Sequence, residues 1–345
     1  MRYGTIPKGL KESLAALLGV VPYPVLDVLV APIQARALIA ASRASIFQAL
    51  GEGAASTSDL ARHLALDESC LDLVLRLLAS MGYVKRRASA WSLTRLGLKH
   101  FGPAAPNPFG DFVAFGAPQW EWISRLDEVL KTGRGVEIHR ALEGSEWNLY
   151  QRAMAEGARD FAAFVAKELP VREGARVCLD VAGSHGLVGA ALCRAHPGLR
   201  SVVLEREEAI PEACRLAKEL RILDVVSFRA CDLRKDEYGE GADALILANI
   251  LHHFSPEVNR EILSRAKRAL KPGGSIGIFD IEAPRSDAPP EAAGDAAALF
   301  FRITSNSACF SGDDYVAWLR ETGFSKPRAV RSVLLPSRLL VTAEA

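Results

Sequence analysis

Several polar side chains in the second half of the sequence directly follow stretches typical of buried strands. Glu205 ends the stretch RSVVLE, Asp232 follows VVSFRAC, and His252 and His253 follow ADALILANI. A carboxylate placed like Glu205 can accept hydrogen bonds from both hydroxyls of a ribose. One placed like Asp232 can accept a hydrogen bond from an adenine amino group. A neutral imidazole can remove the proton of a phenol near physiological pH.

A fourth segment, VCLDVAGSHGLVGAAL, carries Asp180 and a short loop between a predicted strand and a predicted helix. Such turns bind nucleotide cofactors in open α/β sheets. Two positions where glycine is expected hold Ala182 and Ser184. The loop lacks the G-x-G-x-x-G spacing that places a pyrophosphate on a helix N-terminus, which disfavours a dinucleotide dehydrogenase.

The elements that must position these residues alternate from Ala175 to the C-terminus. Strand-like stretches are separated by helical segments such as PEACRLAKEL and EVNREILSRAKRAL; these stretches are RVCLDV, RSVVLE, VVSFRAC, ADALILANI and GSIGIFDI. This alternation predicts an α/β fold, a parallel sheet with helices on both faces. Ligands bind such sheets at the carboxyl ends of the strands, where all four polar segments would meet.

The region before it, residues 33–101, is expected to form a small helical domain. Ser58 is expected to cap a first helix, a second helix is expected from Asp67 to Met81, and VKRRASAWSLT is typical of a β-ribbon. This order predicts a winged helix. The second helix is net acidic and the whole chain carries a net charge of +1, which disfavours binding to nucleic acid.

Three regions are expected along the chain: a helical domain at 1–102, a helical linker and pocket region at 103–170, and a catalytic domain at 171–345. The apolar stretch from Leu14 to Ile33 is interrupted by prolines and an aspartate, which predicts two short helices rather than a membrane span. An exposed apolar surface of that size requires a partner. We expect a homodimer with a two-fold interface.

The six cysteines are scattered and form no C-x-x-C pair. This pattern indicates reduced thiols in a cytoplasmic protein and predicts neither a zinc site nor any other metal site.

Five motifs together resemble a known family. LDVAGSHG, VVLE, CDL, NILHHF and LKPGGSIGIFD occur in the order and spacing seen in class I S-adenosylmethionine-dependent methyltransferases. Over about residues 15–343 the chain resembles the small-molecule O-methyltransferases of plants and their bacterial secondary-metabolism relatives. The resemblance implies a winged-helix-like dimerisation domain, a Rossmann-like catalytic domain and S-adenosylmethionine as cofactor.

The resemblance also implies roles for individual residues. His252 falls on the family's general base, and Asp280 on the carboxylate that orients it. The expected cofactor-binding residues are Asp180, Ala182, Gly183, Ser184, Gly186, Glu205, Asp232, Leu233 and Asn249. Ser184 is expected to donate a hydrogen bond to the cofactor carboxylate. The expected substrate pocket consists of Phe112, Phe115, Trp120, Met154, His253 and Asn306.

One departure from the family pattern leaves the chemistry open. The family's second supporting acid falls near Cys309, where no carboxylate stands. The leading hypothesis is O-methylation of a small aromatic or polyketide-like metabolite. The alternatives are C-methylation, a repurposed enzyme of the same fold that transfers no methyl group, and a ligand-sensing winged-helix regulator.

Overall fold

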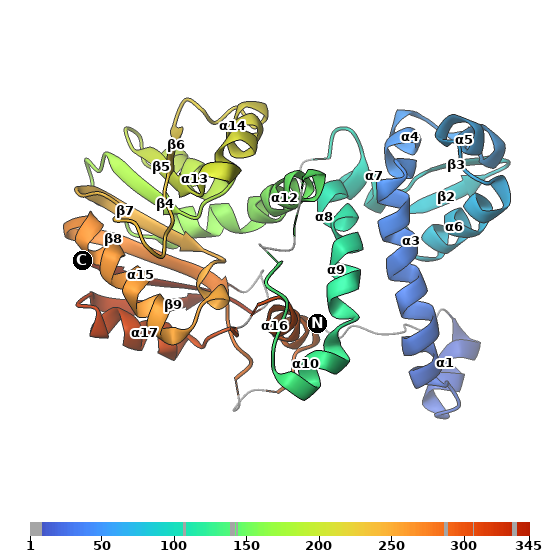
Figure 1. The fold of residues 1–345 in the computed structure, drawn as a ribbon. Coiled ribbons are helices and arrows are strands. Elements are labelled where there is room, and N and C mark those ends of the chain that lie inside the picture. The colour runs from blue at the N-terminus through green and yellow to red at the C-terminus, as the bar shows by residue number, and fades with distance from the viewer. Residues whose placement is uncertain are drawn as a thin grey trace. The chain divides into compact units, whose positions relative to one another are not determined.

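The computed structural model describes residues 9–105, 108–138, 142, 144–285, 289–305, 307–332 and 337–345. The chain divides into two compact units, Met1–Gln119 and Trp120–Ala345 (Figure 1). The boundaries expected at residues 102 and 170 remain a prediction.

The first unit begins with an apolar helical arm. Helix α1 (Leu10–Leu17) is followed by a continuous helical stretch made of α2 (Tyr23–Val25), the π-helical turn η1 (Leu26–Val30) and α3 (Ala31–Arg43). The prediction that prolines divide this region into two short helices was therefore wrong after Tyr23. Pro24 stands in the first turn of α2, where no backbone donor is required, and Pro32 follows the wider π-helical turn.

The arm exposes most of its large apolar side chains. These are Leu10, Leu14, Leu17, Leu18, Val20, Tyr23, Val25, Val28, Leu29, Val30 and Ile33. By length and composition alone, Tyr23–Arg43 could cross a membrane, since its mean hydropathy reaches 1.6 and 11% of that window is buried. A helix that a second protein chain covers has the same features.

The rest of the first unit is a small helical domain with a three-stranded antiparallel sheet in the order β1-β3-β2. Its elements are α4 (Ile46–Glu52), β1 (Ala55–Ser56), α5 (Thr57–Leu64), α6 (Glu68–Ser80), β2 (Val84–Arg87), β3 (Ala90–Leu93), α7 (Arg95–Phe101) and α8 (Gly110–Ala114). The expected helices and β-ribbon are all present, and Phe47, Leu75 and Trp91 lie in their common core. The expected cap was misplaced by two residues, because Ser56 rather than Ser58 accepts the hydrogen bond from the Asp59 backbone N–H.

The second unit begins with helices. Helix α9 (Gly116–Ile123) spans the boundary between the units and is followed by α10 (Leu126–Thr132) and the long helix α12 (Ser145–Glu168). Ala153, Ala158 and Val165 form part of the buried stripe of α12. This stripe explains why a helix of 24 residues is stable here: its apolar face is covered by the sheet unit that follows.

A seven-stranded sheet in the order β6-β5-β4-β7-β8-β10-β9 forms the centre of the second unit. Its strands are β4 (Val177–Val181), β5 (Arg200–Glu205), β6 (Val226–Ala230), β7 (Ala242–Ala248), β8 (Leu270–Ile281), β9 (Ser325–Arg331) and β10 (Arg338–Glu344). The first five pair in parallel, as predicted. The sheet as a whole is mixed, because β10 pairs antiparallel with both β8 and β9.

Helices cover both faces of this sheet (Figure 1). The helices of this unit that have not yet been described are α13 (Leu187–Ala195), α14 (Ile210–Glu219), α15 (Pro256–Ala269), α16 (Ala292–Thr304) and α17 (Gly312–Glu321), with the short turns η2 (Glu207–Ala209) and η3 (Leu251–His253). Leu245 and Leu247 of β7 face the core shared with α15 and α17, whereas Ala244 and Ile246 face the core shared with α12 and α13. This alternation makes the buried strands apolar on both faces.

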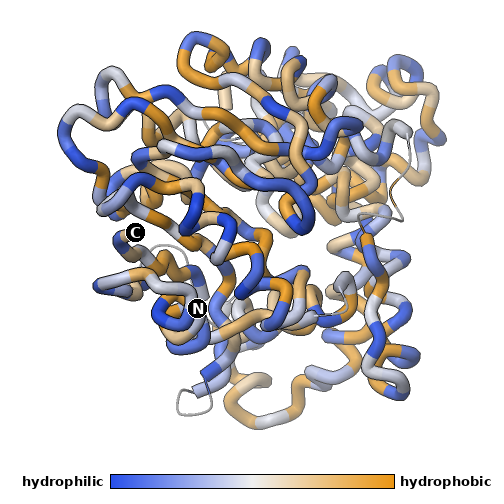
Figure 2. The backbone as a smooth tube through the Cα atoms, turned by 60° about the vertical axis from the view of Figure 1, so that its left-hand side comes forward, coloured by the Kyte–Doolittle hydropathy of each residue, from blue (hydrophilic) through white to orange (hydrophobic). Residues whose placement is uncertain are grey.

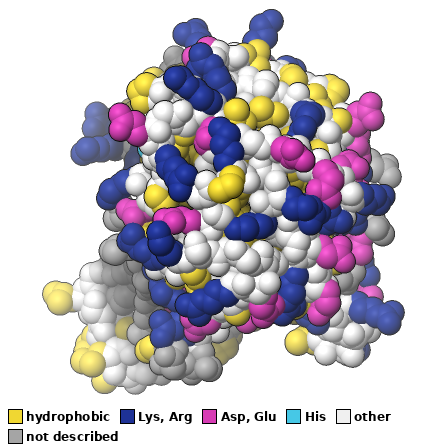
Figure 3. Space-filling model, turned by 90° about the vertical axis from the view of Figure 1, so that its left-hand side faces the viewer, with side chains coloured by type: hydrophobic (Ala, Val, Ile, Leu, Met, Phe, Trp, Pro, Cys, Tyr) yellow, Lys and Arg dark blue, Asp and Glu magenta, His cyan; other side chains and the backbone are white. Residues whose placement is uncertain are grey.

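Hydrophobic and hydrophilic stretches alternate along the described backbone (Figure 2). On the face shown in Figure 3, basic and acidic side chains are interspersed and form no extended field of one sign. That face therefore offers no continuous basic surface for a polyanion.

Candidate active site

Asp180, in the strand β4, is a fully buried carboxylate at the carboxyl edge of the sheet. Its Oδ2 accepts a hydrogen bond of 3.0 Å from the backbone N–H of Gly189 in α13. Its Oδ1 is buried and has no hydrogen-bond partner among the described residues. Burial, and to a smaller extent the charge of Glu205, raise the pKa of Asp180 to about 7.

The loop after β4 has a left-handed backbone at three alternate positions, which are Ala182 (φ 56°), Ser184 (φ 46°) and Gly186 (φ 74°). Glycine adopts this conformation without strain, but each residue with a Cβ costs about 1–2 kcal/mol. Gly183 is needed for a different reason, since a Cβ there would lie 2.4 Å from the carboxyl carbon of Asp180. The two substitutions thus leave the backbone in the conformation that glycine would favour.

Hydrogen bonds from both sides hold the strained loop. The N–H of Ala182 donates to the carbonyl of Leu204 at 2.7 Å, and the N–H of Ser184 donates to Oε2 of Glu205 at 3.0 Å. The buried His185 accepts a hydrogen bond of 3.1 Å at Nδ1 from the Leu187 N–H and bonds to the backbone of Met154. Burial lowers the pKa of His185 to about 4, so the ring is neutral at physiological pH. His185 was not among the residues expected to form this site.

Glu205 ends β5 and faces this loop. Besides the bond from Ser184, its Oε1 accepts a hydrogen bond of 2.9 Å from the Arg206 N–H. Burial raises the pKa of Glu205, whereas the two backbone donors lower it. Each carboxylate oxygen can accept a further hydrogen bond, so the side chain can still receive two ribose hydroxyls.

Asp232 and Leu233 follow β6, as the sequence predicted. The Asp232 carboxylate accepts hydrogen bonds from Arg234, of 3.1 Å from the backbone N–H and 3.3 Å from Nε. Burial raises the pKa of Asp232, but the bonds from Arg234 outweigh it and the pKa is lowered. The backbone carbonyl of Leu233 accepts a 2.6 Å hydrogen bond from the hydroxyl of Tyr238, which anchors the turn.

Asn249 and His252 follow β7. Asn249 has a left-handed backbone (φ 52°), donates from its N–H to the carbonyl of Phe279, and accepts a 3.2 Å bond at Oδ1 from Arg338. His252 is buried in the turn η3, and its Nδ1 lies 2.5 Å from Oδ1 of Asp280 in β8. Its other nitrogen, Nε2, is buried and has no hydrogen-bond partner among the described residues.

Asp280 is surrounded by a tyrosine and a thiol in the region where the family pattern has a second supporting acid. Tyr315 of α17 donates a 3.0 Å hydrogen bond from its hydroxyl to Oδ2 of Asp280. Cys309 is buried nearby, and burial, followed by the charge of Asp280, raises its pKa to about 12. Asp314 forms a capping box with Ser311 at the start of α17, so this carboxylate caps the helix. Tyr315 was not among the residues expected at the site.

The predicted pocket residues lie in both units of the chain. Phe112 in α8 is exposed and Phe115 is buried, and both belong to the first unit. Trp120 and Met154 are half-buried parts of the second unit. His253 is also half-buried, with its ring centroid 4.2 Å from that of His252, while the Phe301 ring lies 4.0 Å from His252 on the α16 side. Asn306 lies outside the described residues.

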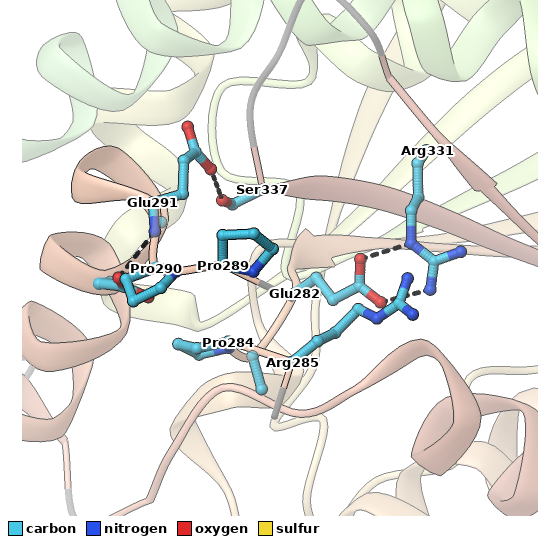
Figure 4. Close-up of a pocket in the computed structure, with 11 residues that line it drawn as sticks. Glu282, Pro284, Arg285, Pro289, Pro290, Glu291, Arg331 and Ser337 are labelled. Atoms are coloured by element: carbon cyan, nitrogen blue, oxygen red, sulfur yellow. Dashed lines mark hydrogen bonds and ion pairs between the residues drawn. The ribbon is translucent and has the colours of Figure 1, made fainter. Parts of the chain in front are cut away.

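A pocket of about 300 Å³ lies beyond the end of β8 and contains none of the predicted site residues (Figure 4). Glu282 and Arg331 are paired with each other on one side of it, and Glu291 accepts a hydrogen bond from Ser337 on the other. Among all the residues that the structure describes, no group of three or more His, Cys, Asp or Glu side chains could hold a metal ion.

The residues around β4 and β5 fit S-adenosylmethionine, the cofactor that the resemblance implies. Ser184 Oγ is buried without a hydrogen-bond partner in the described chain, and so is Oδ1 of Asp180. Ser184 lies in the loop after β4, where its N–H donates to Glu205 at the end of β5, and Asp180 lies in β4 just before that loop. Orphaned buried polar atoms are costly in a folded protein, and a polar ligand at this turn would satisfy them.

Comparison with known proteins agrees with this geometry. A family model described as the O-methyltransferase domain matches residues 115–325, and one described as the O-methyltransferase dimerisation domain matches residues 27–100. The 3-hydroxy-5-methyl-1-naphthoate 3-O-methyltransferase of Streptomyces sahachiroi is 27% identical over 85% of this chain and 87% of its own. The bacteriochlorophyllide d C-20 methyltransferase of Chlorobaculum tepidum is 26% identical over 70% of this chain and 73% of its own.

A solved structure supports the fold over nearly the whole length. The structure of human N-acetylserotonin methyltransferase in complex with S-adenosylmethionine has a TM-score of 0.81 and 17% identity to this chain, and the match covers 98% of this chain and 99% of that one. The expected order of a dimerisation domain and an α/β catalytic domain is confirmed. The chain therefore belongs to the O-methyltransferase family and is an S-adenosylmethionine-dependent methyltransferase that carries a dimerisation domain.

Proposed function

We propose that the enzyme methylates a hydroxyl group on a small aromatic or polyketide-like metabolite, with His252 as the general base. The observation that carries this proposal is the buried pair of His252 and Asp280, which leaves Nε2 of the imidazole without a partner in the described chain. The Streptomyces sahachiroi relative is named for methylation of a hydroxyl on a naphthoate ring, which supports a phenolic acceptor.

The pair determines which nitrogen of His252 acts as the base. With Asp280 accepting at 2.5 Å, the proton of the neutral ring stays on Nδ1, and Nε2 keeps its lone pair. Nε2 removes the acceptor's proton as the oxygen attacks, and the resulting imidazolium lies beside the Asp280 carboxylate. The bound cofactor supplies an activated methyl group. Asp180, Ser184 and Glu205 would hold and orient this cofactor through the carboxylates of Asp180 and Glu205 and the hydroxyl of Ser184.

The decisive experiment compares wild type with His252→Ala on a panel of hydroxylated aromatic acids and S-adenosylmethionine, with methylated product detected by mass spectrometry. We expect turnover to fall by about 10²–10⁴ while calorimetry gives a nearly unchanged cofactor affinity. His253→Ala is the matched control, because it changes the adjacent imidazole, and it should retain a much larger part of the activity. Unchanged turnover in His252→Ala would rule out His252 as the base.

A carbon acceptor is the second candidate, since the relative from Chlorobaculum tepidum is named as a C-20 methyltransferase. The same panel distinguishes the two, because NMR of the product shows whether the new methyl group is bonded to oxygen or carbon. A C-methylated product would be consistent with the proposed cofactor site, but it would show that the acceptor atom is carbon instead of oxygen.

The exposed apolar arm supports a homodimer in which two copies cover each other's helices. The dimerisation-domain match begins at residue 27, inside the helical stretch Tyr23–Arg43. A second copy related by a two-fold axis would remove the arm's apolar side chains from water. We further propose a cytoplasmic enzyme, which its six unpaired cysteines support, with a small-molecule rather than a nucleic-acid partner.

A further inference from the structure

Tyr315 is a fully buried tyrosine whose hydroxyl bonds to the carboxylate beside His252. It lies in the second turn of α17, and its hydroxyl is 3.0 Å from Oδ2 of Asp280. Burial, followed by the negative charge of Asp280, raises the pKa of Tyr315 well above its usual value. The hydroxyl therefore keeps its proton and acts as a donor.

Asp280 is held by three donors from three elements. Nδ1 of His252 and the N–H of Ile281, at 2.5 and 2.8 Å, both reach Oδ1, and within the described part of the chain Oδ2 is bonded by Tyr315 alone. The carboxylate cannot rotate about its side-chain bonds without breaking at least one of these bonds. Because Tyr315 bonds the oxygen that His252 does not, it fixes the plane of the carboxylate and draws negative charge toward Oδ2, away from the oxygen that faces His252.

The other polar groups facing this carboxylate add one positive charge. Arg338 of β10 lies within electrostatic range of Asp280 and donates to Asn249. Cys309, on the segment before α17, is a neutral thiol, since its pKa is raised to about 12 by burial. His253 stacks beside His252 from the same turn.

Asp280 and Arg338 carry opposite charges, so the Tyr315 hydroxyl adds a neutral donor to the Asp280 carboxylate and no further charge.

We propose that Tyr315 is a positioning residue for methyl transfer: its hydroxyl fixes the Asp280 carboxylate and thereby holds the imidazole of His252 in its orientation. This inference rests on the proposed role of His252 as the base. Tyr315 touches neither substrate nor cofactor in this role, and acts only through Asp280.

The test is Tyr315→Phe, which removes one hydroxyl and keeps the ring in the core. Without the hydroxyl, the Asp280 carboxylate attracts a protonated His252 more strongly, so the acidic limb of the pH–kcat profile moves to higher pH, by about 0.5–1 unit. At the pH optimum, we expect kcat to fall about 3–10-fold, with the KM of the acceptor and the cofactor affinity nearly unchanged. Thr322→Val at the end of the same helix is the control, because its hydroxyl bonds to the helix carbonyls of Trp318 and Leu319 and not to Asp280.

The results separate this inference from the proposed function. If His252→Ala abolishes turnover but Tyr315→Phe leaves both kcat and the acidic limb where they are in wild type, the role of Tyr315 is wrong and the base stands. If His252→Ala keeps full turnover, the base itself is wrong. Should Tyr315→Phe fail to fold, Cys309→Asp places a second negative charge near Asp280, and it must also move the acidic limb to higher pH; an unmoved limb would overturn the electrostatic argument.

Discussion

Nδ1 of His252 lies 2.5 Å from Oδ1 of Asp280, and both side chains are almost completely buried. The two residues are 28 positions apart and come together because β7 and β8 are parallel neighbours whose carboxyl ends meet. Any imidazolium formed at His252 during proton transfer is therefore next to a negative charge.

Asp280→Asn should lower kcat by about 10–100-fold, because the amide keeps the shape of the carboxylate but cannot stabilise the imidazolium by charge. Steady-state kinetics with saturating cofactor measures the change, and cofactor affinity should stay within about two-fold of wild type. Glu282→Gln is the control: it neutralises a carboxylate two residues farther along the chain, which pairs with Arg331 instead. Equal losses of kcat in the two variants would show a general effect on the fold.

Glu205→Ala should weaken the binding of S-adenosylmethionine by about 1.5–3 kcal/mol, because a charged acceptor for ribose hydroxyls is lost and the Ser184 N–H loses its partner. Isothermal titration calorimetry measures this directly. Glu208→Ala removes a nearby exposed carboxylate that is paired with Arg206, and it should leave the affinity unchanged. An affinity of Glu205→Ala equal to that of wild type would show that Glu205 does not contact the cofactor.

Asp180→Asn should stabilise the protein in a pH-dependent manner. The pKa of this carboxyl is about 7 in the folded chain against 3.8 as its ordinary value, so the unfolded chain loses the proton first as the pH rises. Wild type therefore loses stability between about pH 4 and pH 7 relative to the variant, and the difference stays constant above that range. We expect the variant to gain about 1–3 kcal/mol in urea unfolding at pH 8 compared with pH 5.

Asp243→Asn provides a control with the opposite sign. Burial raises the pKa of Asp243, but the hydrogen bonds from Lys271 and two backbone N–H groups outweigh it, and the pKa is lowered. The stability that the Asp243 carboxylate contributes is therefore lost as the pH falls through the folded pKa. If the stability differences from wild type changed with pH in the same direction in both variants, the raised pKa of Asp180 would be contradicted.

Ala182→Val should destabilise the protein by about 1–2 kcal/mol, because a β-branched side chain is strongly strained at the φ of 56° found there. Ala182→Gly is the matched variant and should retain both stability and cofactor affinity, since glycine adopts this backbone freely. Thermal unfolding and calorimetry measure the two properties. If valine were tolerated as well as glycine, the loop would not have a left-handed backbone at this position.

The strands that carry the site could be predicted because buried parallel strands are continuous apolar stretches, as in ADALILA of β7. That placed Asp180, Glu205 and His252 at one edge of the sheet. Strand β9, SKPRAVR, was not predicted, because its charges and Pro327 are typical of an edge strand and show no clear hydrophobic period.

The link from Tyr315 to Asp280 could not be predicted from spacing. Tyr315 looks like an ordinary member of the apolar face that also carries Trp318 and Leu319. Its contact depends on how α17 lies against β8, which is a property of tertiary packing. The helical arm was mispredicted for a local reason: Pro24 lies in a first turn, and a π-helical turn precedes Pro32.

The last prediction concerns the arm as a dimer interface. Val28 and Leu29 are 77% and 58% exposed in the single chain, within the helical stretch where the dimerisation-domain match begins. Burying such side chains between two copies contributes about 1.5–3 kcal/mol for each, so a charge at both positions opposes association strongly.

The double variant Val28→Asp and Leu29→Asp should therefore be monomeric in light scattering at micromolar concentration, where wild type has twice the chain mass of 37.3 kDa. Leu130→Asp is the matched control, because Leu130 is a 73% exposed leucine of α10, outside the arm, and its replacement should leave the dimer intact. The same helix composition would also suit a membrane, and vesicle flotation distinguishes the two. A wild-type chain that is monomeric in solution and floats with lipid vesicles would show that the arm binds a membrane instead of a second copy.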